Sequence, residues 1–233
     1  MLYGFITRPE SSVLPLDSVD MGYPNFLDRA VDESSLSGGV GAFSCYDALF
    51  REICLMYGHN WLLLSAIAHV ESHYNHEAIS NVGARGLMQI MPSTAAIYGV
   101  DKSQLTDPRV SIDLANRYLL EIERMLALPE GINYHDQLSL TLAAYNGGIG
   151  RVYDAQRLAR SAGNDPNRWD ELKWHMLSLR KEDVYTRPEV RYGRFKGSGA
   201  TLAYVRNVMN VYDDYCIKAE NSPYHLLPAA RGE

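Results

Sequence analysis

The chain of 233 residues is long enough for one domain with a sizeable core, and its 46% hydrophobic and 21% charged residues are ordinary for a globular protein. A formal net charge of −6 argues against generic nucleic-acid binding. The longest apolar stretch, WLLLSAIAHV, is far below the roughly 18 residues of a membrane-spanning helix, so we expect no integral membrane segment. The start, MLYGFITRPESSV, shows no secretory signal, because it lacks a basic region followed by an apolar one.

Composition divides the chain into three parts. Residues 1–43 are rich in Pro, Ser, Gly and Asp and show no sustained period, which predicts an extended or flexible arm. Helical signals dominate residues 44–218, which we expect to form one domain, and residues 219–233 are predicted to be a tail. We find no internal repeat.

The helical period predicts an all-α fold. Ser44 and Asp47 resemble a capping box at the start of the first helix. The loop 74–91 could contain a small strand element. In this loop, Gly83 and Gly86 are predicted to permit a positive φ or a close approach of the backbone. Helices are expected at about 44–58, 60–73 and 92–99, and from 107 through the apolar positions up to 126. Further helices are expected at about 136–145, 149–161, 167–180 and 201–217.

The three cysteines do not fix the redox compartment. Cys45 and Cys54 are predicted to share a helix about 13 Å apart, which is too far for a disulfide. At most one of them could therefore pair with Cys216, and buried free thiols are the favoured interpretation.

The stretch HVESHYNHE raises the question of a metal site. On a helix, His69 and His73 share a face, which is a metal-ligand spacing. Glu71 lies about 200° from His69 around the helix and cannot join them at one ion. His76 and Glu77 follow the expected helix end and could still contribute. The spacing therefore disfavours a metal site, and none is predicted.

Glu71 instead faces the apolar side of the expected helix, where Leu64, Ile67 and Ala68 lie one or two turns before it. Burial would raise the pKa of its carboxyl, which suits a general acid near neutral pH. The alternative is a capping or salt-bridging glutamate at a helix end. Spacing alone does not decide between them.

Four motifs resemble one family. Glu71-Ser72 is followed by Ser80 and then by GARGLMQIMPSTA at 83–95, LAAYNGG at 142–148 and TLAYVRNVMNVYDDY at 201–215. Their order and spacing resemble the lytic transglycosylases of the soluble-lytic-transglycosylase and goose-type-lysozyme-like group. The resemblance covers roughly residues 45–217. It implies a single lysozyme-like helical domain with a substrate groove, which acts without a cofactor on peptidoglycan in the periplasm or cell envelope.

The activity that this resemblance implies is cleavage of the β-1,4 bond between N-acetylmuramic acid and N-acetylglucosamine. Glu71 would first protonate the glycosidic oxygen and then, as a carboxylate, take the proton of the C6 hydroxyl that attacks C1. The products would end in 1,6-anhydromuramic acid. Since the nucleophile belongs to the substrate, no second protein carboxylate is needed, in contrast to most glycosidases.

Five further residues carry over by their place in the motifs. Ser80 would hydrogen-bond near the acid or the acetamido group, or serve as a turn serine. Gln89 would bond the sugar, or clamp the loop backbone. Met91 would line the groove, or belong to the core. Tyr145 would stand close to the acid, or pack in the core, and Asn146 would bind substrate or shape the turn at two glycines.

The chain departs from the family pattern in two places. Ala200 stands where the family often has a glutamate, which puts that contact to substrate in doubt. The segment of about 150–199 is longer than expected and includes residues 180–196, which hold six basic and three acidic residues, whereas the rest of the chain is net −9. We expect an added wall or lid whose positive charge meets peptide carboxylates, or else a decorated surface insertion.

Three other functions remain open at this point. A hydrolytic muramidase would need a second carboxylate, for which Glu77 and Asp101 are remote candidates. A catalytically silent glycan-binding or assembly protein would use Glu71 structurally. A metalloprotein would be built on His69, His73 and His76. The sequence does not identify a partner in the cell-envelope machinery.

Overall fold

The structure is a computed structural model, and it describes residues 43–220; most of the predicted arm and tail lie outside these residues. Helices and the loops that join them make up the described part, which confirms the all-α prediction. No helix within it is long and apolar enough to cross a bilayer. The elements are α1 (Asp47–Tyr57), α2 (Trp61–Ser72), α3 (Pro92–Ile97), the 3-10 helix η4 (Lys102–Thr106), α4 (Pro108–Leu126), α5 (Tyr134–Gly147), α6 (Ile149–Ser161), α7 (Trp169–Ser178), α8 (Glu182–Tyr185) and α9 (Ser198–Glu220).

Several helix ends follow the predicted signals. Gly58 ends α1 in the left-handed conformation with a φ of 73°. Asp107 caps α4, since its carboxylate accepts the backbone N–H groups of Arg109 and Val110. The elements η4 and α8 were not predicted, because a single turn is too short to show a helical period.

The predicted capping box at Ser44 is wrong in its details. Tyr46, and not Ser44, precedes the first residue of α1, and it makes no side-chain cap. The carboxylate of Asp47 turns back and accepts bonds from the backbone N–H and the hydroxyl of Ser44 and from the N–H of Phe43. Only the acidic half of a box is therefore present.

The prediction for the cysteines needs one correction. Cys45 lies in the turn before α1 and is exposed, because that helix starts only at Asp47. Cys54 is buried and Cys216 is half-buried, and no disulfide joins cysteines within the described residues.

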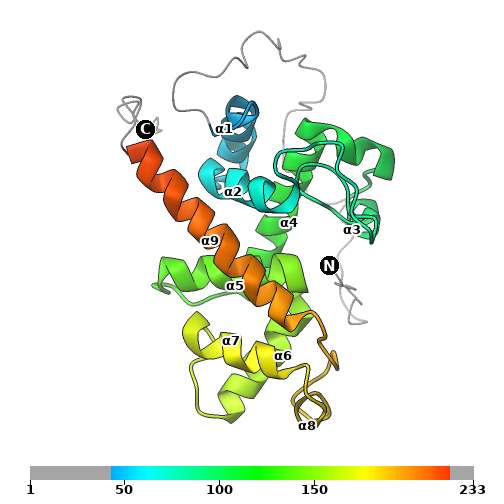
Figure 1. Cartoon of the computed structure of the whole chain (residues 1–233). Helices are drawn as coiled ribbons and strands as arrows, with labels where there is room; N and C mark the ends of the chain where they lie inside the picture. Colours follow the sequence, from blue (N-terminus) through cyan, green and yellow to red (C-terminus); the bar gives the residue numbers. More distant parts are fainter. Residues whose placement is uncertain (1–42, 221–233) are drawn as a thin grey trace, which may run out of the picture.

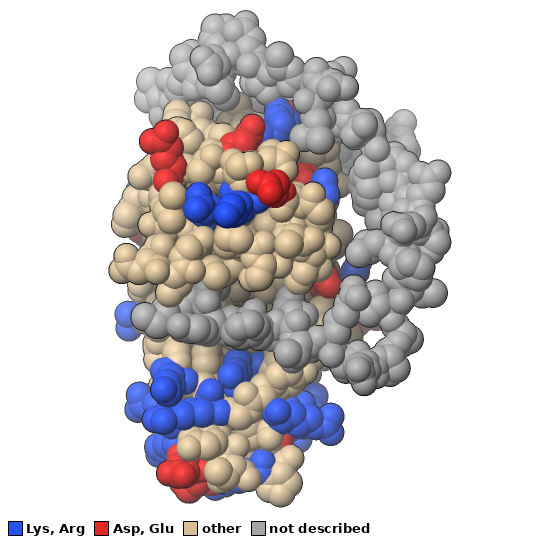
Figure 2. Space-filling view, turned by 90° about the vertical axis from the view of Figure 1, so that its right-hand side faces the viewer, with Lys and Arg blue, Asp and Glu red and all other residues tan. Residues whose placement is uncertain are grey.

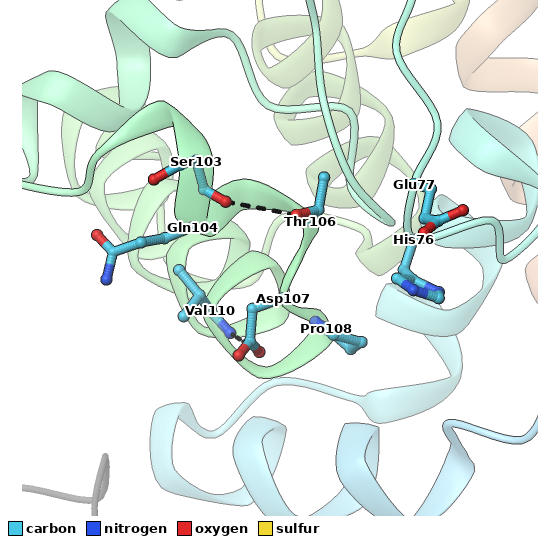
Figure 3. A pocket seen from close by; sticks show the side chains of 8 residues that line it. All are labelled: His76, Glu77, Ser103, Gln104, Thr106, Asp107, Pro108 and Val110. Atoms are coloured by element: carbon cyan, nitrogen blue, oxygen red, sulfur yellow. Dashed lines mark hydrogen bonds between the residues drawn. The ribbon is translucent and has the colours of Figure 1, made fainter.

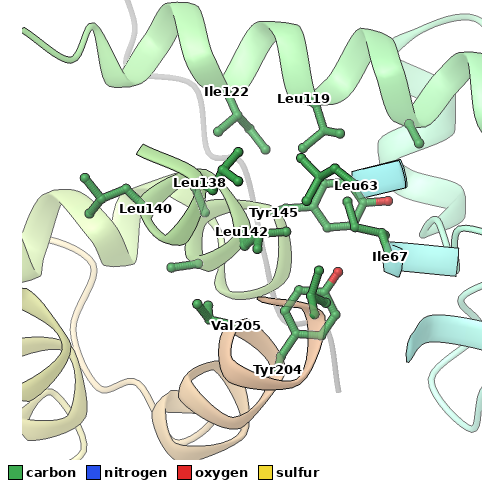
Figure 4. Packing of buried hydrophobic residues seen from close by; sticks show 14 of the residues in the cluster. Leu63, Ile67, Leu119, Ile122, Leu138, Leu140, Leu142, Tyr145, Tyr204 and Val205 are labelled. Carbon is green, nitrogen blue, oxygen red and sulfur yellow. The ribbon is translucent and has the colours of Figure 1, made fainter. Parts of the chain in front are cut away.

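Helix α9 runs obliquely from the upper left past α5 and packs on α2, α5 and α7 (Figure 1). The helices α1 to α4 lie in the upper part of this view, and α6 to α8 lie in the lower part, with α5 between them. Side chains from α2, α4, α5 and α9 meet in the core around Tyr145 (Figure 4), among them Ile67, Leu119, Leu142 and Val205. The two halves thus share one core.

The loop between α2 and α3 contains the small strand element that the sequence left open. Arg85 pairs with Ile79 on one side and with Ile90 on the other, in isolated antiparallel bridges. The N–H of Gly86 also donates to the carbonyl of Ala78 at 3.0 Å. These bonds fold the loop back on itself between α2 and α3.

Gly86 confirms the prediction of close backbone approach. Its φ is 76°, and a Cβ atom built on it would lie 1.8 Å from the carbonyl oxygen of Leu105 in η4. Gly83 has a φ of 90° but open space around it. Position 86 therefore requires glycine both for its positive φ and for its close contact with η4, whereas position 83 favours glycine only for its positive φ.

A buried polar network fastens the turn between α1 and α2 to α4. Asn116 donates through Nδ2 to the carbonyl of Ile112, so its Oδ1 accepts from His59 Nδ1 at 2.7 Å. The other ring nitrogen of His59 then lies 3.4 Å from a carboxylate oxygen of Glu123. Burial lowers the pKa of His59, but the bonds to Glu123 and Asn116 outweigh it, and the pKa is raised.

Candidate active site

Glu71 lies in the last turn of α2 with its carboxyl turned into the protein. Its Oε1 atom is buried and has no hydrogen-bond partner among the described residues. Desolvation raises the pKa of this carboxyl from 4.5 to about 7, and the nearby hydroxyl of Tyr204 moderates the rise. The Glu71 carboxyl therefore keeps its proton to a higher pH than an exposed glutamate does. No ion pair of Glu71 with a described residue supports the capping or salt-bridging alternative.

Two tyrosines surround this carboxyl. Tyr145 of α5 donates through its hydroxyl to the carbonyl of Met88 at 3.1 Å. The hydroxyl of Tyr204 in α9 is buried beside Glu71 but falls short of full hydrogen-bond geometry with it. Both hydroxyls turn toward the side on which α2 lies (Figure 4). Burial first and the charge of Glu71 second raise both tyrosine pKa values, so each hydroxyl stays protonated.

Ser72 ties the acid-bearing helix to the following loop. Its buried hydroxyl lies 2.8 Å from the carbonyl oxygen of Leu87 and 3.1 Å from that of Ala68. The loop segment that leads into Gln89 and Met91 is thereby held against the end of α2. This contact gives Ser72, beside the acid, a positioning role that the motif itself did not explain.

A hollow opens next to Tyr145. It brings together four of the predicted site residues, namely Gln89, Met91, Tyr145 and Asn146, with Ile90, Thr94 and Tyr118 completing its lining. Ser80 and Glu71 are not among the lining residues. Glu71 lies close enough to Tyr145 for its charge to raise the pKa of that hydroxyl.

Gln89 clamps the loop. Its side-chain nitrogen donates to the carbonyl oxygens of Gly86 at 2.9 Å and Ala78 at 3.1 Å. The residue is buried and has a φ of 45°, a strained conformation for a residue with a Cβ atom. These bonds match the backbone-clamp interpretation, and they leave the amide oxygen as its group for a ligand.

Ser80 and Asn146 also make structural bonds. The Ser80 hydroxyl accepts the backbone N–H of Ala84 at 3.0 Å, as a turn serine does. The Oδ1 atom of Asn146 accepts the hydroxyl of Thr201 at 2.8 Å, which joins the end of α5 to the start of α9. Ala200, at the place of the expected glutamate, is exposed one residue before this contact.

Tyr118 is a site residue that the sequence did not single out. Its ring lies 5.3 Å from that of Tyr145, and burial raises its pKa to about 12. In the sequence it sits at an apolar position of the helical period of α4 and is indistinguishable from a core residue.

A larger hollow of about 430 Å³ lies elsewhere, between the loop after α2 and the start of α4 (Figure 3). His76 and Glu77 stand on one side of it, and the side chains of η4 and the first turn of α4 stand on the other. His76 is held by the hydroxyl of Tyr46 at 3.0 Å, and the carboxylate of Asp107 is used by the cap of α4. None of the predicted site residues lines it.

The histidines of α2 do not converge with other ligands. The rings of His69 and His73 lie 5.3 Å apart, and His73 ends the helix with a φ of 50°. Within residues 43–220 no group of three or more His, Cys, Asp or Glu side chains is arranged to hold a metal ion. The metalloprotein alternative thus has no geometric support in this part of the chain.

Known proteins share this architecture. Residues 48–167 match the family described as "Transglycosylase SLT domain". The chain is 38% identical over 168 residues to the membrane-bound lytic murein transglycosylase F of Stutzerimonas stutzeri, covering 72% of this chain and 33% of that protein. It is 36% identical over 168 residues to the protein of the same name from Marinobacter nauticus, covering 72% and 32%.

A solved structure agrees. The chain superimposes with a TM-score of 0.51 and 26% identity on a 70-kDa soluble lytic transglycosylase solved in complex with bulgecin A, covering 79% of this chain and 26% of that one. The chain spans about a third of the length of the curated relatives. Its helical domain is lysozyme-like, and the chain belongs to the SLT transglycosylase family.

Proposed function

We propose that the chain is a peptidoglycan lytic transglycosylase with Glu71 as its single acid and base. The observation that carries the proposal is the buried Oε1 of Glu71, which has no protein partner among the described residues while its pKa is raised to about 7. A carboxyl in this state can give up a proton at neutral pH and accept one in the next step.

The reaction uses one proton relay. Protonated Glu71 donates to the oxygen of the β-1,4 bond between N-acetylmuramic acid and N-acetylglucosamine, and the C1–O bond breaks. The sugar's 2-acetamido group stabilises the cationic centre. The Glu71 carboxylate then removes the proton of the C6 hydroxyl, whose oxygen attacks C1 and closes the 1,6-anhydro ring. Glu71 is protonated again and no water is consumed.

The lining of the hollow supports contacts to the sugar. In our proposal the amide oxygen of Gln89 and the side chain of Asn146 bond the strand, Met91 packs on it, and Tyr145 fixes the acid. Ser80 acts through the turn that carries the loop, with its hydroxyl proton left for the acetamido group. Each role goes beyond the bonds that these residues make within the protein.

The surroundings of the two remote carboxylates favour the non-hydrolytic route. Asp101 caps η4, where its carboxylate accepts bonds from the N–H and the hydroxyl of Ser103. Glu77 is exposed and lines the other hollow. A hydrolase would need one of them beside the scissile bond to hold a water.

The place of action follows from the same proposal. Peptidoglycan is a cell-envelope polymer, and the relatives are named membrane-bound lytic murein transglycosylases. We therefore place the protein in the periplasm or cell envelope, acting on glycan strands without a cofactor. In this proposal, residues 44–218 are the catalytic domain and about 150–199 the inserted part.

A digest of bacterial sacculi tests the proposal. Purified wild-type protein, Glu71→Gln and the control Glu77→Gln, which removes an exposed carboxylate six residues away, are incubated with sacculi. Released muropeptides are identified by mass spectrometry. We expect products lighter by one water than hydrolysis products from the wild type and the control, and none from Glu71→Gln.

Other outcomes would redirect the assignment. Reducing-end products that depend on Glu71 would indicate a muramidase and a second carboxylate. Equal, negligible release from wild type and Glu71→Gln would refute catalysis and favour a glycan-binding role.

A further inference from the structure

The segment 180–196 concentrates positive charge at one end of the molecule. Figure 2 shows Lys and Arg gathered in the lower part, where α6 to α8 lie. The rest of the chain is net −9, so this charge is local. All six basic side chains of the segment are exposed, namely Arg180, Lys181, Arg187, Arg191, Arg194 and Lys196.

A buried carboxylate holds the second half of this segment in place. Asp154 of α6 has no solvent exposure, and it accepts the backbone N–H groups of Arg191 at 2.8 Å and Tyr192 at 3.0 Å. It also pairs with Arg157, which donates to the carbonyl of Glu189 at 2.6 Å. Burying a charge in this way is costly and is not needed for a solvated surface loop.

A second arginine of α6 adds to this brace. Arg151 donates to the carbonyl oxygens of Tyr192 and Gly193, the latter at 2.8 Å. Its guanidinium also lies 5.3 Å from the centre of the Phe195 ring. The backbone from residue 189 to residue 193 is thus fixed on α6 by five hydrogen bonds.

The braced segment borders the hollow at the end of α5. Phe195 is buried against Gly147, where an added Cβ atom would lie 2.9 Å from its ring. Gly147 directly follows Asn146, which lines the hollow. Arg194 and Lys196 flank Phe195 in the chain, and both are exposed.

We propose that residues 187–196, braced on α6 by Asp154 and Arg151, form a basic wall that binds the carboxylates of the peptides attached to the glycan strand. The proposal rests on the proposed function, because the ligand is the substrate of that site. A peptide carried by a sugar in the hollow would reach charges next to Asn146. A flat anionic membrane would meet the acidic remainder of the chain as well, which disfavours it as the partner.

The test compares two substrates that differ in their peptides. The variant with Arg191→Gln, Arg194→Gln and Lys196→Gln is set beside a control with Lys102→Gln, Arg124→Gln and Lys218→Gln, three exposed charges outside the segment. Initial rates are measured on intact sacculi and on glycan strands stripped of peptides by an amidase. On intact sacculi at low salt we expect the initial rate of the wall variant to be roughly tenfold lower than that of the wild type, which is the effect of losing three exposed ion pairs. On stripped strands it should match the wild type.

Binding provides a measurement that does not depend on catalysis. The same substitutions are placed in Glu71→Gln protein. Its binding to intact sacculi, measured by sedimentation, is compared with its binding to immobilised glycan strands stripped of peptides. A selective loss on the intact material supports the wall even if the wild type releases no product, which would refute the proposed function alone.

Three results would refute the proposal of a basic wall. These are equal losses on both substrates, no loss on either, or a loss that the control variant shares. The wall variant can also be tested on vesicles of phosphatidylglycerol and phosphatidylcholine. If its binding to these vesicles falls while its binding to sacculi is unchanged, the charges serve a lipid surface instead.

Discussion

Replacing Glu71 by Gln should make the protein more stable above neutral pH. The folded protein raises the pKa of this carboxyl from 4.5 to about 7. A raised carboxyl pKa means that the folded state binds the proton more tightly than the unfolded state, so stability falls as pH rises from about 4.5 to 7. The shift corresponds to roughly 3 kcal/mol, at about 1.4 kcal/mol per pKa unit. An amide of the same shape has no proton to lose and avoids this cost.

Urea unfolding of both proteins at a series of pH values measures the difference. At about pH 4, where both states of Glu71 are protonated, we expect nearly equal free energies of unfolding. At about pH 8 the variant should be more stable by up to roughly 3 kcal/mol, with Glu77→Gln as the matched control for removing a charge. A variant that is no more stable than the wild type at the higher pH would refute the burial of Glu71 on which the site depends.

Four further outcomes follow from the geometry. The initial rate on sacculi should fall as pH rises through about 7, because Glu71 then lacks the proton that it donates; a rate that is flat to about pH 9 would contradict this. Asp154→Ala should lower the free energy of unfolding by about 3–5 kcal/mol, because it breaks a buried ion pair. Calorimetry should show a melting temperature lower by about 10 °C. Gly86→Ala should cost more than about 2 kcal/mol in urea unfolding, whereas Gly83→Ala, with open space, should show the cost of its φ alone. His59→Gln should destabilise more at about pH 6 than at about pH 8.5, because the raised pKa of His59 contributes stability that is lost as pH rises through it.

The sequence predicted the helices well where their ends carry side-chain signals. Asp107 and Gly58 mark ends that the structure confirms. The turn at Ser44 was misjudged, because the Asp47 carboxylate accepts the N–H and the hydroxyl of Ser44, whereas the hydroxyl oxygen does not accept the N–H of Asp47 as a capping box requires. The single-turn elements η4 and α8 are fixed by tertiary contacts and local caps that no period reveals.

The candidate site was predictable only in part. Motif spacing pointed to Glu71 and to four of the residues that line the hollow, but it could not show that the Gln89 nitrogen is bound to two carbonyls. Tyr204 stood inside a quoted motif without an assigned role, and Tyr118 looked like a core position. Both depend on which helices meet, which is a property of the whole core and not of one segment.

Helix α9 limits how the two halves of this domain could move. It is one unbroken helix of 23 residues that packs on α2 above and on α7 below, and Tyr204 lies in its path between them. Such a strut, about 34 Å long, prevents the two halves from swinging apart as hinged jaws would. Ser72 holds the loop that leads into the hollow on the end of α2, and Asp154 and Arg151 hold the following basic segment on α6. The spacing between the acid and the hollow is therefore set once, when the chain folds, and not anew with each ligand.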